Sequence, residues 1–80
     1  MTDMDTHKAD IIFCQAWERA RRYDTPLTLI QARWVESLKK YVHDVVRDTG
    51  EVLATDLTYC AACSLAARDM NTAYVRAKYY

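Results

Sequence analysis

The sequence predicts an all-α protein, a small antiparallel bundle of three main helices, with a short fourth helix at the C-terminus as an open alternative. Apolar residues recur at helical spacing in three segments of the 80-residue chain. A single Gly and a single Pro leave few residues for the tight turns that join strands. The hydrophobic content of 51% suffices for one core, so residues 1–80 are expected to form a single helical domain.

The first helix is expected over residues 6–23. At about 100° per residue, one face of this segment is apolar and contains Ala9, Ile12, Phe13, Ala16, Trp17, Ala20 and Tyr23. Asp24-Thr25-Pro26 should end the helix, because proline disfavours a helical conformation in the residue before it.

A second helix is expected from Thr25, as N-cap, to about Asp48, with Gly50 as its C-terminal stop. Its apolar residues fall on an arc of about 160° and are Leu27, Ile30, Trp34, Val35, Leu38, Tyr41, Val42, Val45 and Val46. An arc this wide predicts a central helix that packs against two neighbours. A competing interpretation is that Leu27-Thr28-Leu29-Ile30 begins a strand.

The stretch Ala20-Arg21-Arg22-Tyr23-Asp24-Thr25-Pro26-Leu27-Thr28-Leu29-Ile30 resembles the opening helix, turn and first strand of diguanylate cyclase domains. In that family the strand leads into metal-binding aspartates, whereas Gln31-Ala32-Arg33-Trp34 follows here, and the family's Gly-Gly-Asp/Glu-Glu-Phe signature is absent. The resemblance therefore implies no cyclase activity.

The third helix is expected from about Asp56, capped by Thr55, to Met70 or beyond. Its inner face is rich in small residues and comprises Tyr59, Cys60, Cys63, Ala66, Ala67 and Met70. The helix either continues through residues 73–79 or breaks at Asn71-Thr72 to leave a separate short helix. The short connections between the segments favour antiparallel neighbours.

Charge and composition narrow the classes of function. Eleven basic and eleven acidic residues give no net charge and hence no strong attraction to nucleic acid or anionic membrane. The sequence contains no run of eighteen apolar residues, so no membrane span is predicted. Its acidic start lacks the features of a secretory signal. Three cysteines without disulfide-scaffold spacing suit a reducing cytoplasm, or the host cytoplasm if the protein is viral.

Cys60-Ala61-Ala62-Cys63 allows core packing, a redox pair or a zinc site. A redox pair requires its first cysteine at a helix N-terminus, preferably after a strand as in thioredoxin-like units, whereas a helical turn and no strand is expected before Cys60. A zinc site would need further ligands, and its candidates, Cys14, His7 and His43, project from polar or frayed positions. Core packing is therefore favoured. No catalytic residue, metal site or cofactor is expected, and the protein is not expected to be an enzyme.

Two basic clusters form the nucleic-acid alternative, a small regulator that uses basic helix ends. Arg19, Arg21 and Arg22 close the first helix, and Arg76 and Lys78 alternate with tyrosines near the C-terminus, as in single-strand binders. Each cluster also has an explanation without nucleic acid. Cations at the end of the first helix interact favourably with the helix dipole, and the side chains of Arg76 and Lys78 can lie along the helix with their charges in solvent.

The preferred function is a non-catalytic protein-binding module that acts by stoichiometric contact with a larger protein or complex, as an inhibitor, adaptor or small subunit. Phage-encoded inhibitors of host machinery, anti-CRISPR proteins among them, are often chains of this size. Residues outside the apolar faces or at the chain end are the candidates for partner binding, namely Ile11, Leu29, Leu65, Arg76, Tyr79 and Tyr80. A homodimer that covers the wide apolar arc is an open alternative.

Overall fold

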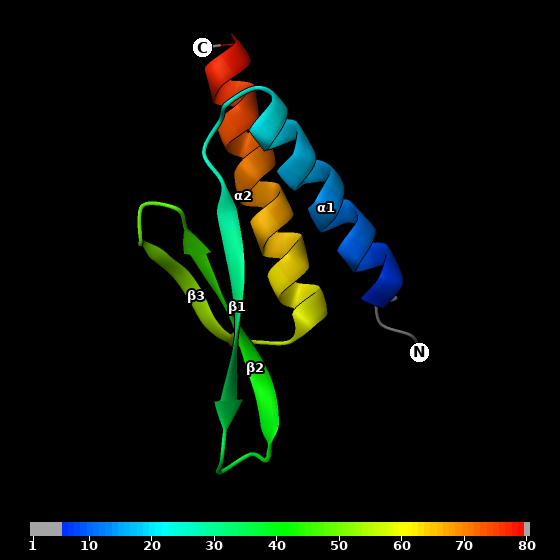
Figure 1. The fold of residues 1–80 in the computed structure, drawn as a ribbon, viewed down its shortest axis with the longest axis vertical. Helices are drawn as coiled ribbons and strands as arrows, with labels where there is room; N and C mark the ends of the chain where they lie inside the picture. The colour runs from blue at the N-terminus through cyan, green and yellow to red at the C-terminus, as the bar shows by residue number, and fades with distance from the viewer. Residues whose placement is uncertain (1–5, 80) are drawn as a thin grey trace.

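The computed structural model describes residues 6–79 and shows an α+β fold (Figure 1). The elements in chain order are α1 (Thr6–Arg22), β1 (Thr28–Val35), β2 (Lys40–Arg47), β3 (Val52–Leu57) and α2 (Tyr59–Tyr79). The strands form one antiparallel sheet in the order β1-β2-β3. The predicted all-α antiparallel bundle is therefore wrong, because the segment expected as the central helix is the hairpin of β1 and β2, and a third strand follows it.

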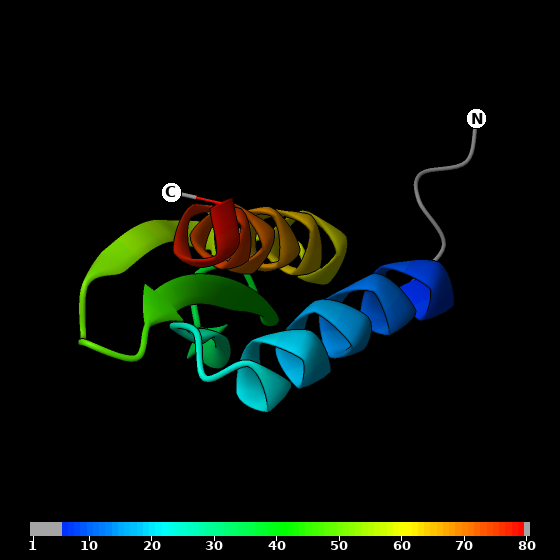
Figure 2. The same ribbon diagram turned by 90° about the horizontal axis from the view of Figure 1, so that it is seen from above.

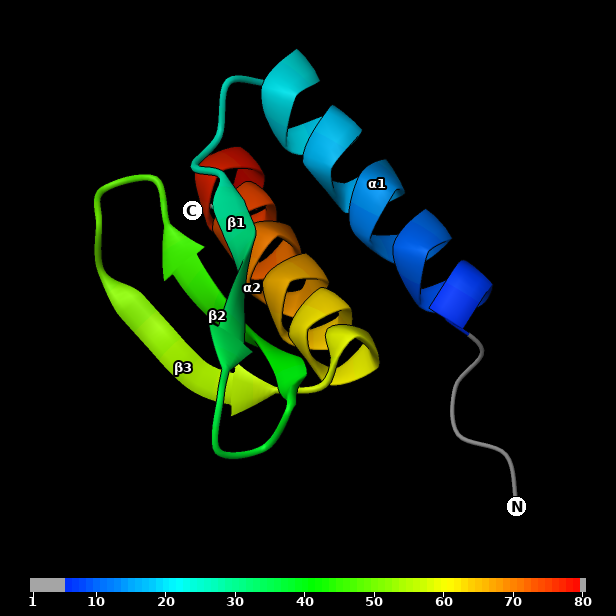
Figure 3. The same cartoon turned by 60° about the horizontal axis from the view of Figure 1, so that its bottom comes forward.

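Helix α2 lies across one face of the sheet, and α1 lies alongside α2 (Figure 2). The two helices run in the same direction, so their C-terminal ends meet at one end of the molecule (Figure 3). The expectation of antiparallel helices is wrong because three strands separate them. Each connection reverses the chain, and after four reversals α2 runs parallel to α1.

The first predicted helix is confirmed almost to the residue. Asp24 ends it in the left-handed conformation with φ of 55°, as is common just beyond a helix C-terminus. The Thr25 N–H donates to the Ala20 carbonyl at 2.9 Å, which completes the terminus. Thr25 therefore belongs to the end of α1 and does not cap a second helix.

The stretch that looked like a second helix is the β1–β2 hairpin, and the competing strand interpretation of residues 27–34 is confirmed. Eight consecutive residue pairs join β1 to β2, from Thr28 opposite Arg47 to Val35 opposite Lys40. The segment is rich in β-branched and aromatic residues, which suit a pleated surface. The pairing of β1 with β2 decides between the helical and the extended conformation of this segment.

The two hairpin turns use different residue types for left-handed backbone positions. Lys39 closes the four-residue turn between β1 and β2 with φ of 54°, which non-glycine residues adopt infrequently. Gly50 provides the corresponding position between β2 and β3 with φ of 99°. Gly50 thus serves a hairpin and does not stop a helix.

The third predicted helix begins later than expected, and the alternative in which it continues through residues 73–79 is confirmed. Thr58, not Thr55, caps α2: its hydroxyl accepts from the Ala61 N–H at 3.2 Å, and its carbonyl accepts from the Ala62 N–H at 2.9 Å. The helix continues unbroken to Tyr79, so no separate short helix is present in the described residues. Residues 52–57, the last two of which were expected to begin this helix, form strand β3.

The core has two clusters, one on each flank of α2. Between the helices, Ala16 and Ala20 of α1 pack with Ala67 and Met70. Between α2 and the sheet, the fully buried Val45 packs with Ala62 and Ala66, while Ile30, Leu53, Leu57 and Leu65 close the cluster from its sides. Phe13 contacts both clusters and connects them.

A polar clamp fixes α2 to the sheet at the end opposite the β1–β2 turn. Thr28, which is 1% exposed, donates its hydroxyl to Asp69 at 2.7 Å. Arg47, directly opposite Thr28 in the sheet, donates Nη2 and Nε to the same carboxylate at 2.8 and 3.2 Å. The Arg47 guanidinium holds the pKa of Asp69 below its usual range, and the Thr28 hydrogen bond acts in the same direction.

Replacing Asp69 by Ala should lower the free energy of unfolding by about 1–3 kcal/mol, because the buried Thr28 hydroxyl loses its partner. The native carboxyl has a lower pKa than the unfolded one, whose value is about 4. Its stabilising contribution should therefore be present above about pH 4 and disappear as the pH falls further.

Urea titrations between neutral and acidic pH would measure both effects. Asp24→Asn is the matched control, because Asp24 is exposed, makes no ion pair among residues 6–79 and has a backbone conformation that Asn tolerates. Equal pH profiles for Asp69→Ala and the wild type would contradict the role of the clamp.

Candidate interaction surfaces

The far end of the β1–β2 hairpin carries three exposed large apolar residues. Trp34, Leu38 and Tyr41, together called the hairpin tip, are 48%, 56% and 61% exposed. Trp34 and Tyr41 lie directly opposite each other, and their rings meet edge to face with centroids 5.2 Å apart. The indole N–H of Trp34 donates to Glu36 at 3.0 Å, and Glu36 also pairs with Lys39. The aromatic rings therefore have defined positions although they face solvent.

The hairpin tip is exposed because the elements that cover the sheet stop before reaching it. Strand β3 ends at Leu57, opposite His43, and α2 begins two residues later at Tyr59. Trp34 and Tyr41 lie one step further along the face that α2 covers, so residues 34–41 project past both elements (Figure 1). Predicted as part of a buried arc, these side chains are instead presented outward.

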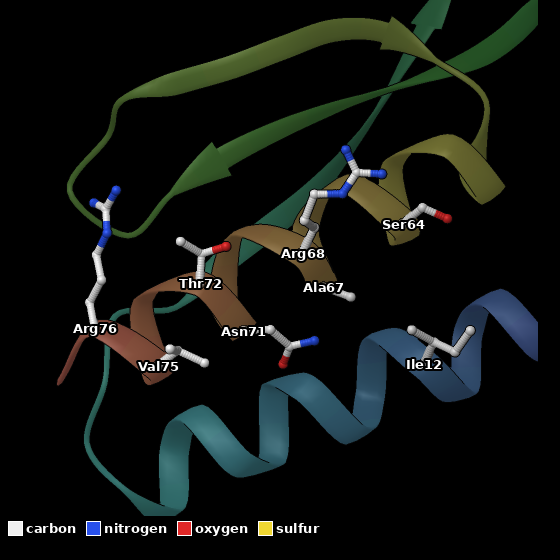
Figure 4. A pocket seen from close by; sticks show the side chains of 8 residues that line it. All are labelled: Ile12, Ser64, Ala67, Arg68, Asn71, Thr72, Val75 and Arg76. Atoms are coloured by element: carbon white, nitrogen blue, oxygen red, sulfur yellow. The ribbon is translucent and has the colours of Figure 1, made fainter. Parts of the chain in front are cut away.

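A groove of about 610 Å³ runs along the outer side of α2 beside α1 (Figure 4). Its lining comprises Ile12, Ser64, Ala67, Arg68, Asn71, Thr72, Val75 and Arg76. Arg68 and Arg76 extend from the side of α2 that faces away from α1, and neither forms an ion pair with any residue between 6 and 79 (Figure 4). The groove thus combines apolar side chains with two cations that form no ion pair among residues 6–79.

A second depression of about 470 Å³ separates α1 from β1. Phe13 and Trp17 form its helical side, and residues 29–32 form its strand side. His43 and Tyr59 meet edge to face at its base, with centroids 5.3 Å apart. His43 Nδ1 is buried and has no hydrogen-bond partner in the described chain.

The basic clusters of the nucleic-acid alternative come together because the helices are parallel. The Arg19 guanidinium lies 4.5 Å from the centre of the Tyr74 ring, and Tyr74 contacts Tyr23 edge to face at 5.3 Å. Lys78 Nζ lies between 5.5 and 5.8 Å from the rings of Tyr23, Tyr74 and Tyr79. We call this group the basic–aromatic end. A hydrogen bond to Tyr74 raises the pKa of Lys78, so its positive charge is maintained.

The other members of that cluster lie further from the centre of the group. Arg21 stacks on Trp17 at 4.9 Å, while Arg22 is exposed beside Glu18. Arg76 belongs to the groove along α2. The sequence predicted two separate basic clusters. In the structure, Arg19 from the first and Lys78 from the second lie together in one site.

The residues predicted to bind a partner do not form one patch. Ile11, Leu29 and Tyr79 are exposed, at 41%, 37% and 68%, but lie on three different elements. Leu65, expected on a solvent face, is half-buried against the cluster that contains Val45, because the sheet covers that side of α2. Tyr80 lies outside the described residues.

The cysteines occupy three different environments. Cys63 is fully buried and Cys60 half-buried at the start of α2, whereas Cys14 is exposed on α1. Among residues 6–79, no group of three or more His, Cys, Asp or Glu side chains is arranged to hold a metal ion. The zinc candidates Cys14, His7 and His43 are thus not gathered around Cys60 and Cys63.

The hairpin tip could not be identified from periodicity, because Trp34, Leu38 and Tyr41 fit the same helical arc as the buried valines. The available signal was the density of β-branched residues around them, which favours a hairpin. In a hairpin, the residues nearest the turn are the ones furthest from the core.

Comparison with family models, with curated proteins and with solved structures finds no match to this chain. In the part of the chain that the structure describes, neither helix is long and apolar enough to cross a membrane.

The exposure of Trp34 predicts a distinct fluorescence signature. In Trp17→Phe, the remaining indole should emit at the long wavelength of a hydrated tryptophan and be quenched strongly by acrylamide. In Trp34→Phe, the half-buried Trp17 should emit at shorter wavelength and be quenched less. The reverse order of quenching would show that the hairpin tip is covered.

Proposed function

We propose that this protein is a stoichiometric protein-binding module that contacts a larger partner through the hairpin tip. The observation that carries the proposal is the exposure of Trp34, Leu38 and Tyr41 at the projecting end of an otherwise paired hairpin. Tryptophan and tyrosine are enriched among the residues that dominate binding energy at protein interfaces. Their ring contact limits the conformational freedom that would be lost on binding.

The size of the chain is compatible with this mode of action. An ordinary interface buries about 800 Å² on each partner, which is about one seventh of the chain's accessible surface of 5694 Å². The hairpin tip and its immediate surroundings would supply much of that area. No enclosed catalytic pocket is required.

Such a module would act as an inhibitor, an adaptor or a small subunit. An inhibitor that blocks a functional surface of a larger complex, in the manner of anti-CRISPR proteins of similar size, is one form of the proposal. Trp34 and Tyr41 would occupy pockets on the partner, while Glu36 and Lys39, which pair with each other, would lie at the margin.

The test is a comparison of variants against a partner captured with the wild-type chain and then purified. Trp34→Ala and Tyr41→Ala should each weaken binding by at least about tenfold in titration calorimetry, because central aromatic residues contribute most to affinity. The affinity of the wild type should change little between low and physiological salt. Both variants should unfold at nearly the wild-type temperature.

Val52→Ala is the matched control, since Val52 is 56% exposed at the start of β3, opposite Val46 and away from the hairpin tip. Its affinity should equal that of the wild type. The proposal fails if the tip variants bind as tightly as Val52→Ala, or if the wild-type chain retains no protein from its native source.

A second candidate function is the binding of single-stranded nucleic acid by the basic–aromatic end. The supporting observation is that Arg19, Lys78 and three tyrosines are in contact there. Proteins that bind single strands combine cations for the phosphates with aromatic rings on which bases stack. Tyr23 and Tyr79 are the rings most available for stacking, at 53% and 68% exposed.

Titration of a labelled single-stranded DNA at two salt concentrations would test this candidate. Binding should weaken as salt rises, and Lys78→Gln should reduce the slope of log K against log salt by about 0.7. Arg68→Gln, which removes an exposed cation elsewhere on α2, should leave the slope unchanged. Equal slopes for the two variants would show that the basic–aromatic end is not the binding site.

A further inference from the structure

The pair Cys60 and Cys63 lies at the junction of a strand and a helix. Strand β3 ends at Leu57, Thr58 caps the helix, and α2 begins at Tyr59, so Cys60 is the second residue of the helix. The sequence argued against a redox pair because a helical turn, and no strand, was expected before Cys60. In the structure a strand precedes the motif, and no full helical turn lies before Cys60. The first turn of a helix favours negative charge and is where a reacting thiolate is best placed.

The two thiols differ in accessibility, as a reacting and a resolving cysteine should. Cys60 is half-buried and has its Sγ 3.7 Å from the Thr6 hydroxyl, so its sulfur lies near the surface at the start of α1. Cys63 is 0% exposed. An external reagent therefore meets Cys60 first, and only a sulfur already attached to Cys60 can be reached by Cys63.

Their spacing places both sulfurs on one face of the helix. Residues three apart in an α-helix have Cβ atoms about 5–6 Å apart, and a disulfide requires about 3.5–4.5 Å. The difference is small enough to be met by tightening the first turn of α2. This turn is also the part of the helix with the fewest backbone hydrogen bonds to break.

A short polar chain lies beside the buried thiol. Tyr59 donates its hydroxyl to Asp10 of α1 at 2.6 Å, and this bond raises the pKa of Tyr59, which stays protonated. Burial raises the pKa of Cys63, and a hydrogen bond with the Tyr59 hydroxyl opposes that effect in part. Cys63 is thus held as a thiol beside a hydroxyl that is itself hydrogen-bonded to Asp10.

We propose that Cys60 and Cys63 form a redox-reactive dithiol that is converted reversibly to an intramolecular disulfide by a small disulfide of the glutathione class. The Cys60 thiolate attacks one sulfur of the small disulfide, a new S–S bond forms, and the first thiolate leaves and takes up a proton. Cys63 then loses its proton and attacks Cys60 Sγ, which expels the second thiolate. The protein dithiol loses two electrons and two protons, and one small disulfide becomes two thiols.

This inference goes beyond the proposed function and is independent of it, because it concerns the start of α2 and not the hairpin tip. Oxidation would draw Cys60 toward Cys63 and away from Thr6. It would therefore alter the contact between the start of α2 and the start of α1 without changing the sheet.

The experiment equilibrates the folded wild-type chain with buffers of different ratios of reduced to oxidised glutathione. After acid quenching and alkylation, peptide mass spectrometry should show a Cys60–Cys63 disulfide whose fraction rises smoothly with the oxidised share and reverses on reduction. Cys14→Ser, which removes the exposed thiol of α1, should give the same curve.

Two variants test the order of the steps. Cys63→Ala should accumulate a mixed disulfide with glutathione on Cys60, whereas Cys60→Ala should leave Cys63 unmodified while the chain is folded. Circular dichroism would establish that each variant is folded. The proposal is overturned if the wild type forms no Cys60–Cys63 disulfide at any ratio, or if glutathione attaches to Cys14 alone.

Discussion

The small side chains of α2 allow one helix to serve as the support for both α1 and the sheet. On one flank, Ala67 packs with Ala16 and Ala20 of α1, and on the other, Ala62 and Ala66 pack against Val45. The distance between packed elements depends on the side chains at the contact, so alanines permit close approach on both flanks. A larger residue at Ala62 or Ala66 would separate the helix from the sheet and disturb the position of every strand.

The position at which α2 begins also determines which part of the sheet is left uncovered. The helix starts beside His43, and the polar clamp of Thr28, Arg47 and Asp69 fixes its course at the other end of the hairpin. The face of the hairpin toward α2 is therefore covered from Thr28 and Arg47 as far as His43 and is left open at Trp34 and Tyr41. The exposure of Trp34 and Tyr41 is a consequence of this offset between strand length and helix position.

The sequence was sufficient to predict α1 and most of α2, because their apolar residues fit only the helical period. It was insufficient for residues 27–48, where Ile30, Trp34, Val42 and Val45 satisfy a helical arc and also line one or other face of two paired strands. The turn that decides between these structures has a left-handed Lys39 in place of the usual Gly or Asn. The same ambiguity concealed the hairpin tip. Because strand β3 was not predicted, α2 was expected to begin too early, and Cys60 was therefore placed beyond its first turn.

Charge is distributed between the layers in a way that the neutral total conceals. The two helices contain seven cations and three carboxylates, whereas the strands and connections between them contain four cations and six carboxylates. On the sheet, Arg33 pairs with Asp44 and Asp56, and Arg33 holds the pKa of Asp44 below its usual range, so the face opposite α2 is largely neutralised. Arg68 and Arg76 on α2 have no such pairing among residues 6–79. An anionic partner would therefore approach the helices and an apolar one the hairpin tip, and the zero net charge argues against neither.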